Sequence, residues 1–253
     1  MFGLEDKHVV VSGAGGGIGR ALVTVFLQAG ARVTACDRDP ALLAALSGVE
    51  TECFELTDHE ASQRAAEAIL ARSGAPDVII GNAGFTRAEG MANVTPAVWD
   101  LEIAINLTGG YNLVAPFLPA MTEAGGGSIV FVSSVNGLAH FGNPAYSAAK
   151  AGLIGYARSL AVECGRSGIR ANVVCPGSVR TPAWDHRLSK EPDLITEVSK
   201  YYPLGRIVTP EEVAQAVLFL ASPLSGGITG VALPVDAGLM AGNLRFVREI
   251  IGA

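Results

Sequence analysis

The chain has 253 residues, of which 49% are hydrophobic and 17% charged, and its formal net charge is −6. This composition is too apolar for a disordered protein, and the length suffices for one large core. The acidic balance offers no basic patch for a phosphate backbone, so a nucleic-acid partner is not expected. No stretch reaches the roughly 18 uninterrupted apolar residues of a membrane span. Charge near the N-terminus also argues against a signal peptide. We therefore expect a cytoplasmic protein that does not bind membranes.

The cysteines and histidines show no spacing typical of metal ligands. The four cysteines contain no CxxC pair, and the four histidines form neither an HxH nor an HxxxH pair. We therefore expect no metal site.

Short apolar runs alternate with helical patterns along most of the chain. The expected strands are 8–11, 32–36, 51–54, 78–80, 128–132, 170–174 and 231–235, and the expected helices are 18–29, 40–47, 59–73, 95–123, 144–164 and 210–221. Almost purely apolar runs are typical of parallel strands covered on both faces. The alternation predicts an α/β fold, a single doubly wound Rossmann-type domain over residues 1–253 with a seven-stranded parallel sheet flanked by helices.

Residues 178–209 interrupt this alternation. The segment contains several prolines, mixed charge and aromatic residues, and it lacks a strand pattern. A long irregular insertion in a compact domain is typically a lid or a binding loop. We therefore expect this segment to cover a substrate.

A glycine-rich turn follows the first expected strand and precedes an apolar-periodic helix. It contains Gly13, Gly17, Ile18 and Gly19. Glycines let the backbone approach a pyrophosphate closely, and a helix N-terminus supplies free N–H groups and positive potential. In this order of strand, turn and helix, the motif favours dinucleotide binding over a flexible surface turn.

Asp37 ends the second expected strand, 18 residues after Gly19. A carboxylate at this place accepts hydrogen bonds from the adenosine ribose and repels a 2′-phosphate, which favours NAD over NADP. Arg38 follows directly, and an arginine could accommodate that phosphate if Asp37 turned away. Taken alone, Asp37 would be an ordinary turn residue, and the preceding glycine turn is what favours the nucleotide role.

Tyr146 and Lys150 lie four residues apart on one face of the expected helix 144–164. An ammonium near a phenol favours the phenolate and lowers a pKa that is ordinarily about 10. Such pairs also occur by chance on helix surfaces. The glycine turn and the pair Ser133-Ser134 just upstream favour a catalytic pair here.

With these motifs assembled, the sequence resembles the short-chain dehydrogenase/reductase family over essentially its whole length. Residues 12–19 resemble the family's T-G-x-x-x-G-I-G turn, with serine for threonine, and residues 81–84 resemble its N-N-A-G element, with glycine first. The resemblance implies that this second element braces the sheet near the adenine, more weakly without its first asparagine. The implied cofactor contacts on the adenine side are Glu55, Leu56, Asn82, Ala83 and Gly84.

The same resemblance implies four catalytic residues. Asn106 would kink a helix and hold a water that relays protons to Lys150, while Ser134 would hold the substrate oxygen near Tyr146. Lys150 would also bind the nicotinamide ribose. The spacing of 12 residues from Ser134 to Tyr146 is one shorter than usual for the family, so Ser133 remains the alternative.

Residues 176–181 resemble the family's P-G-x-x-x-T segment beside the nicotinamide. The implied contacts on this side of the cofactor are Tyr146, Lys150, Pro176, Gly177, Val179 and Thr181. The implied activity is hydride transfer between NAD(H) and a secondary alcohol or its ketone. Family members usually form a homodimer or homotetramer, and the tail 239–253 could bury an apolar face in such a contact.

The substrate is less well defined by the sequence. The candidate contacts are Ser134 and Tyr146 of the catalytic set together with Asn136, His140 and Trp184, and each of the last three could equally have a packing or surface role. Their mixture of aromatic and hydrogen-bonding groups suits a small polyol or sugar. One alternative is an NADPH-dependent 3-oxoacyl carrier-protein reductase, which Asp37 and the acidic chain oppose. Another is a non-catalytic NAD-binding regulator, which the intact catalytic set opposes.

Overall fold

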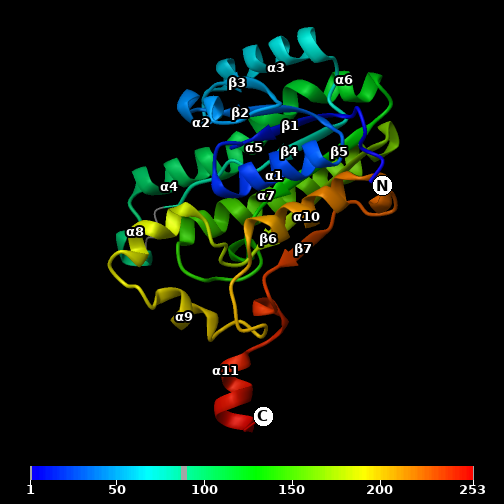
Figure 1. Ribbon diagram of the computed structural model, residues 1–253. Coiled ribbons are helices and arrows are strands. Elements are labelled where there is room, and N and C mark those ends of the chain that lie inside the picture. Colours follow the sequence, from blue (N-terminus) through cyan, green and yellow to red (C-terminus); the bar gives the residue numbers. More distant parts are fainter. Residues whose placement is uncertain (1, 87–89, 253) are drawn as a thin grey trace.

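A parallel β-sheet forms the centre of the molecule, with helices on both of its faces (Figure 1). The computed structural model describes residues 2–86 and 90–252. Within these residues the sheet has seven strands in the order β3-β2-β1-β4-β5-β6-β7. The strands are β1 (His8–Ser12), β2 (Arg32–Asp37), β3 (Glu50–Cys53), β4 (Val78–Gly81), β5 (Gly127–Val132), β6 (Ile169–Pro176) and β7 (Ala232–Val235). The predicted α/β class and seven-stranded parallel sheet are confirmed.

The strand order reverses between β1 and β4. From β1 the chain moves outward through β2 and β3, and it then returns to place β4 on the other side of β1. The connections that leave the carboxyl ends of β1 and β4 therefore diverge. In doubly wound sheets such a reversal opens a crevice that binds ligands.

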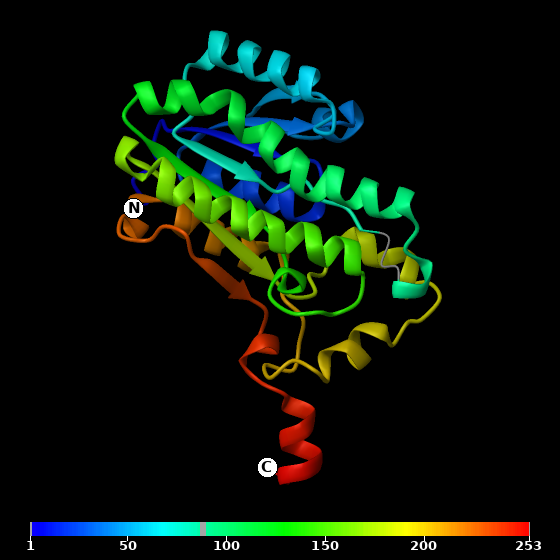
Figure 2. The ribbon, with the colours of Figure 1, turned by 180° about the vertical axis from the view of Figure 1, so that it is seen from behind.

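Two helical layers explain why the strands are so apolar. Helices α1 (Gly17–Gln28) and α10 (Pro210–Ala221) cover one face, while α3 (His59–Ser73), α5 (Gly109–Val114) and α7 (Pro144–Glu163) cover the other (Figures 1 and 2). Successive residues of β1 alternate between the two cores, with Val9 and Val11 packing in the first and Val10 in the second. Because both faces are covered, every residue of β1 is buried.

The helix expected over 95–123 is divided into several pieces, and one division lies at Asn106, where the resemblance implies a kink. The segment contains α4 (Pro96–Ile103), a π-helical turn (Ala104–Thr108), α5, a 3-10 turn (Ala115–Phe117) and α6 (Leu118–Glu123). The Asn106 side-chain amide donates to the Glu102 carbonyl, four residues earlier, at 3.0 Å. That carbonyl is the ordinary acceptor for the backbone N–H of residue 106, so the side chain competes with the α-helical ladder. Pro116 then has no backbone N–H to continue the ladder.

The other predicted boundaries differ by a few residues. Helix α2 (Pro40–Ala44) ends three residues before its predicted end at 47, and β3 lies one residue earlier than predicted. Such shifts at element ends are common because terminal turns and strand ends are only weakly specified by local sequence.

The insertion 178–209 contains short helices rather than only irregular chain. A 3-10 turn (Pro182–Trp184) leads into α8 (Asp185–Leu188), and α9 (Leu194–Ser199) follows. The base of the insertion is closed by a parallel bridge between Val179 and Val208. The hydroxyl of Tyr202 also accepts a hydrogen bond of 2.8 Å from the backbone N–H of Ser178. Both ends of the insertion are thereby fixed to each other.

The C-terminal segment extends away from the rest of the molecule (Figures 1 and 2). It contains α11 (Leu244–Phe246) and a π-helical turn (Val247–Ile251). Four large apolar residues are exposed on it, namely Phe246, Val247, Ile250 and Ile251. Among the helices of the described residues, none combines the length and apolarity needed to cross a membrane.

Candidate functional site

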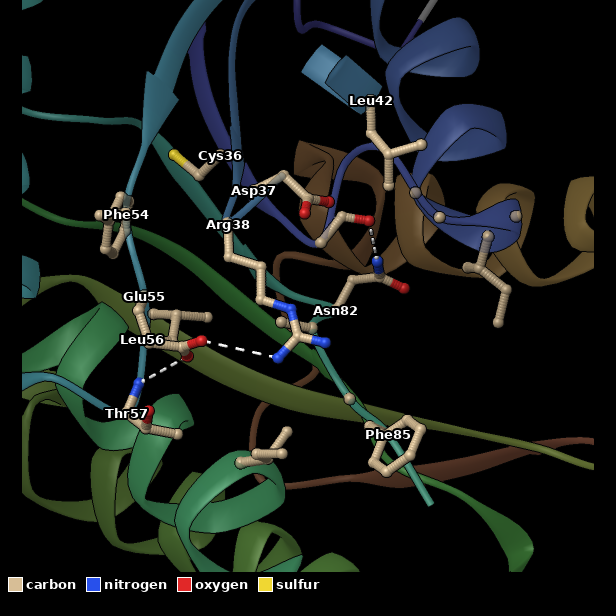
Figure 3. A pocket seen from close by; sticks show the side chains of 18 of the residues that line it. Cys36, Asp37, Arg38, Leu42, Phe54, Glu55, Leu56, Thr57, Asn82 and Phe85 are labelled. Atoms are coloured by element: carbon tan, nitrogen blue, oxygen red, sulfur yellow. Dashed lines mark hydrogen bonds and ion pairs between the residues drawn. The ribbon is translucent and has the colours of Figure 1, made fainter. Parts of the chain in front are cut away.

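A cavity of about 410 Å³ opens at the carboxyl ends of β1, β2 and β4, where the strand order reverses (Figure 3). The predicted cofactor residues that line it are Gly13, Gly17, Ile18, Gly19, Asp37, Glu55, Leu56, Asn82, Ala83, Gly84 and Thr181. Other lining residues were not predicted to bind cofactor: Gly16, Cys36, Arg38, Leu42, Phe54, Thr57, Phe85 and Ile105. Most of them end or follow β1–β4, and that position is the signal that could have identified them.

The glycine turn forms one wall of the cavity because side chains would not fit there. Gly13 has a φ of +62°, and a Cβ on it would lie 2.8 Å from the Cα of Ala83. A Cβ on Gly19 would overlap the carbonyl oxygen of Gly13. Helix α1 begins without a side-chain cap, so its first N–H groups remain available at the turn. This cradle fits the pyrophosphate of a dinucleotide.

Asp37 is fixed against the glycine turn. One carboxylate oxygen accepts a hydrogen bond of 3.0 Å from the backbone N–H of Gly15, and the other accepts one of 3.2 Å from that of Asp39. A carboxylate has about four acceptor positions, so capacity for ribose hydroxyls remains.

The segment after β4 is braced to β1 by hydrogen bonds. The side-chain amide of Asn82 donates to the carbonyls of Ser12 and Gly13, at 3.1 and 3.0 Å. The Ser12 hydroxyl in turn accepts from the backbone N–H groups of Asn82 and Ala83. At Gly81 the ring of Phe131 fills the space that a Cβ would need. The bracing therefore comes from Ser12 and Asn82, with no side chain at position 81.

Asn106 lies in the π-helical turn and is only 2% exposed. Its side-chain oxygen accepts from the backbone N–H of Phe85 at 3.1 Å, and its side-chain nitrogen donates to the Phe85 carbonyl at 2.7 Å. The same nitrogen donates to a carboxylate oxygen of Glu102 at 2.9 Å. Glu102 is 1% exposed and was missed from the sequence, although its spacing of four from Asn106 places both on one helix face.

Ser134, Tyr146 and Lys150 are brought together by β5 and α7. The Lys150 ammonium lies 5.5 Å from the centroid of the Tyr146 ring and donates to the Val132 carbonyl at 3.0 Å. The Ser134 hydroxyl lies close enough to Tyr146 to lower the pKa of the phenol. The hydroxyl of Ser133 instead donates to the backbone carbonyl of Lys150 at 2.9 Å and is buried. The geometry thus favours Ser134 over Ser133 as the serine that faces the tyrosine.

Lys150 and Asn106 approach the cavity near Gly84. A Cβ on Gly84 would lie 3.1 Å from both the Asn106 side-chain oxygen and the Lys150 ammonium. Tyr146, Lys150, Pro176, Gly177 and Val179 are not among the described residues that line the cavity itself. Val179 pairs with Val208 instead.

Burial dominates the electrostatics of the pair. Loss of hydration raises the pKa of Tyr146 to about 12; the Ser134 hydroxyl lowers it, and the charges of Glu102 and Cys175 raise it. Loss of hydration lowers the pKa of Lys150 to about 8. In the protein without cofactor, burial is the largest influence on the tyrosine pKa, and the predicted depression of that pKa by Lys150 and a nicotinamide ring stays a prediction.

The predicted substrate residues have different surroundings. The Asn136 side-chain amide donates to the Gly142 carbonyl at 2.8 Å and to the Ser147 hydroxyl at 3.1 Å. These bonds fix the loop that joins Asn136 to the start of α7. His140 is exposed on that loop, and Trp184 is partly buried in the insertion. Among the described residues, no group of three or more His, Cys, Asp or Glu side chains could hold a metal ion.

The sheet, the strand-order reversal and the glycine cradle define a dinucleotide-binding protein. A family model described as enoyl-(acyl carrier protein) reductase matches residues 13–240. An uncharacterized oxidoreductase of Schizosaccharomyces pombe is 40% identical over 98% of this chain and 96% of its own. A 3-oxoacyl-[acyl-carrier-protein] reductase of Thermotoga maritima is 37% identical over 94% of this chain and 99% of its own.

Solved structures agree with these sequence relatives. An oxidoreductase of the short-chain dehydrogenase/reductase family from Burkholderia thailandensis has a TM-score of 0.93 and 44% identity, covering 98% of each chain. An aldohexose dehydrogenase from Thermoplasma acidophilum has a TM-score of 0.89 and 30% identity, covering 95% of this chain and 96% of its own. The chain belongs to the short-chain dehydrogenase/reductase family. It is therefore an oxidoreductase of alcohols and ketones that uses NAD(P).

Proposed function

We propose that this protein is an NAD-dependent dehydrogenase that transfers a hydride between NAD(H) and a secondary alcohol or its ketone. The position of Asp37 carries the preference for NAD. Its carboxylate is held at the cavity wall by the Gly15 N–H, where it would accept from the adenosine ribose and repel a 2′-phosphate.

The chain offers a site for each part of the cofactor. The glycine cradle and the start of α1 would hold the pyrophosphate, and Asp37 the adenosine ribose. Lys150 would bind the nicotinamide ribose, and Thr181, together with the backbone from Pro176 onward, the nicotinamide amide. A bound nicotinamide supplies the hydride chemistry, and the protein supplies position and electrostatics.

Proton transfer falls to the residues around Tyr146. In the oxidising direction, the Tyr146 hydroxyl oxygen would take the proton of the substrate alcohol, while Ser134 holds the substrate oxygen. Lys150 would favour the phenolate and pass the proton onward, and Asn106 would orient the relay. General acid–base help of this kind contributes roughly 10²–10⁴-fold. Because burial raises the pKa of Tyr146 to about 12, the positive charge beside it has to offset that cost.

For the substrate we propose a small polyol or sugar. The hydrogen-bonding groups of Ser134 and Asn136 support this proposal, as does the likeness to the Thermoplasma acidophilum aldohexose dehydrogenase. We further propose that residues 1–253 act as one nucleotide-binding and catalytic domain and that the insertion 178–209 covers the substrate. Its closed base supports that role, as does Thr181 near its start, which lines the cavity.

The decisive experiment follows reduced-nicotinamide absorbance with NAD or NADP and a panel of polyols, sugars, hydroxy acids and cyclic alcohols. Tyr146→Phe serves as the blank: it should bind NAD as the wild type does and lose nearly all turnover. Wild-type activity in this variant would refute the role of Tyr146. Failure of the wild type to bind either nucleotide would refute the dehydrogenase itself.

A second candidate is an NADPH-dependent 3-oxoacyl carrier-protein reductase, supported by the 37% identity to the Thermotoga maritima reductase. Asp37 and the net charge of −6 oppose it, because both an NADP phosphate and a carrier protein are acidic. NADPH oxidation with acetoacetyl-CoA or an acetoacetyl carrier protein would distinguish the two candidates.

A further inference from the structure

Two oppositely charged side chains face each other across the mouth of the cavity. Arg38 follows the end of β2, and Glu55 lies just after β3. Both residues line the cavity, and a guanidinium nitrogen of Arg38 lies 3.6 Å from a carboxylate oxygen of Glu55. Figure 3 shows the Arg38 side chain reaching across the opening toward Glu55.

Glu55 is the better fixed of the two. Its second carboxylate oxygen accepts a hydrogen bond of 3.1 Å from the backbone N–H of Thr57 (Figure 3). The Arg38 side chain is 65% exposed and the Glu55 side chain 43%. An arginine side chain this exposed can change rotamer at little cost, whereas the carboxylate is tethered to its own loop.

The position of Arg38 gives the pair its significance. It directly follows Asp37, whose carboxylate is bound to the Gly15 N–H and cannot easily turn away. A guanidinium beside this acid is a suitable ligand for a phosphate, since its planar fork matches phosphate oxygens. The same guanidinium has its ion-pair partner in Glu55.

We propose that Glu55 is a second selectivity residue, which disfavours NADP by occupying the Arg38 guanidinium that would otherwise neutralise a 2′-phosphate. This inference rests on the proposed NAD-dependent function. Asp37 repels the phosphate directly, and Glu55 withholds the cation that could offset this repulsion. An exposed ion pair shifts an equilibrium by up to about fivefold, so Glu55 tunes the preference that Asp37 establishes.

The test is a double-mutant cycle of nucleotide binding, measured by titration calorimetry on the protein alone at low ionic strength. Glu55→Gln removes the charge and keeps an oxygen that can accept from Thr57 and from an adenine amino group. Arg38→Gln and the double variant complete the cycle. Glu60→Gln is the matched control, because Glu60 and Arg64 form an exposed pair of the same 3.6 Å length on α3.

We expect Glu55→Gln to raise the ratio of NADP to NAD affinity about threefold to fivefold, since any contact with the adenine is common to both nucleotides. In the Arg38→Gln background the gain should disappear, and Glu60→Gln should change neither nucleotide. The gain in NADP affinity of the Glu55→Gln single variant should also shrink as salt is added, because exposed charges are screened.

Two results would overturn the inference. An equal gain in NADP affinity with and without Arg38 would mean that Glu55 acts on the phosphate through its own charge. An unchanged ratio of NADP to NAD affinity in Glu55→Gln would exclude the selectivity role. Both results differ from a third outcome, in which the wild-type protein binds neither nucleotide. That outcome would refute the proposed function instead.

Discussion

Lys150 is 2% exposed, which is an unusual environment for an ammonium group. Its nitrogen donates to the Val132 carbonyl, and burial lowers its pKa to about 8. The protein thus holds a cation at a place where hydration is poor. The buried charge lowers the stability of the folded protein, and it lies where it would stabilise a phenolate and bind a nicotinamide ribose.

This cost gives a pH dependence of stability. The Lys150 pKa is about 8 in the folded protein and near 10.5 in the unfolded chain. Between these values the unfolded chain binds a proton that the folded protein does not, so raising the pH favours folding. Relative to Lys150→Met, we expect the wild type's free energy of unfolding to rise by roughly 2–3 kcal/mol from pH 8 to pH 10.

Urea unfolding of both proteins at several pH values, without nucleotide, measures this difference. A constant difference between wild type and Lys150→Met across that range would show that the lysine keeps its ordinary pKa. Burial raises the pKa of Tyr146 to about 12 in the folded protein, and its titration near pH 10 in the unfolded chain is common to both proteins, so it cancels in the difference.

At Asp37 the expected change is in nucleotide selectivity. Asp37→Asn keeps an oxygen for the Gly15 N–H and removes the charge that repels a 2′-phosphate. We expect the ratio of NAD to NADP affinity to fall at least about tenfold, because a hydrogen bond to a charged group is worth about 1.5–3 kcal/mol. Asp37→Ala should lower the ratio further and also weaken NAD. Unchanged NADP affinity in both variants would remove Asp37 from the selectivity set.

At the scale of elements, helix α7 positions the catalytic side chains through its first turn. Asn143 caps the helix with a φ of +52°, and its side-chain oxygen accepts from the backbone N–H of Tyr146 at 3.4 Å. Pro144 occupies the first helical position, where its missing N–H costs nothing. The cap therefore fixes where the helix starts and, with it, the place of Tyr146.

Two substitutions of Asn143 separate the cost of losing the cap from the cost of a positive φ. Asn143→Ala loses the cap and places an alanine in the left-handed region, so we expect a loss of about 2–3 kcal/mol in stability. Asn143→Gly loses the cap alone and should cost only a few tenths of a kcal/mol. Thermal and urea unfolding would measure both variants. Equal losses for alanine and glycine would show that the positive φ carries no strain.

At the scale of the whole molecule, the C-terminal tail exposes a group of apolar side chains. Phe246, Ile250 and Ile251 are more than half exposed on a segment that extends from the body (Figure 1). Exposed apolar side chains grouped in this way mark contact surfaces. We expect a homodimer or homotetramer in which another copy covers this tail.

Light scattering after gel filtration would test that expectation. Introducing Ile250→Glu together with Ile251→Glu should lower the assembly mass or weaken association at least tenfold, because two apolar side chains would no longer be buried. Glu249→Gln, on the same turn, should leave the mass unchanged. A wild-type monomer at micromolar concentration would contradict the expectation.

The sequence by itself determined the doubly wound sheet, because alternating apolar runs and helical periods leave few other ways to bury both strand faces. It also predicted the glycine cradle and Asp37, since backbone space and strand ends are local properties. The catalytic roles of Ser134, Tyr146 and Lys150 stay predictions, now with a geometry that brings the three together.

Only the tertiary structure decided what depends on contacts between distant segments. The resemblance implied a kink at Asn106, but its cause, the contacts of the side chain with the Glu102 carbonyl and the Phe85 backbone, is seen only in the structure. The ion pair of Arg38 with Glu55 joins the ends of two strands. The raised pKa of Tyr146 follows from burial, which sums the packing of many elements and is not encoded in the spacing of four residues to Lys150.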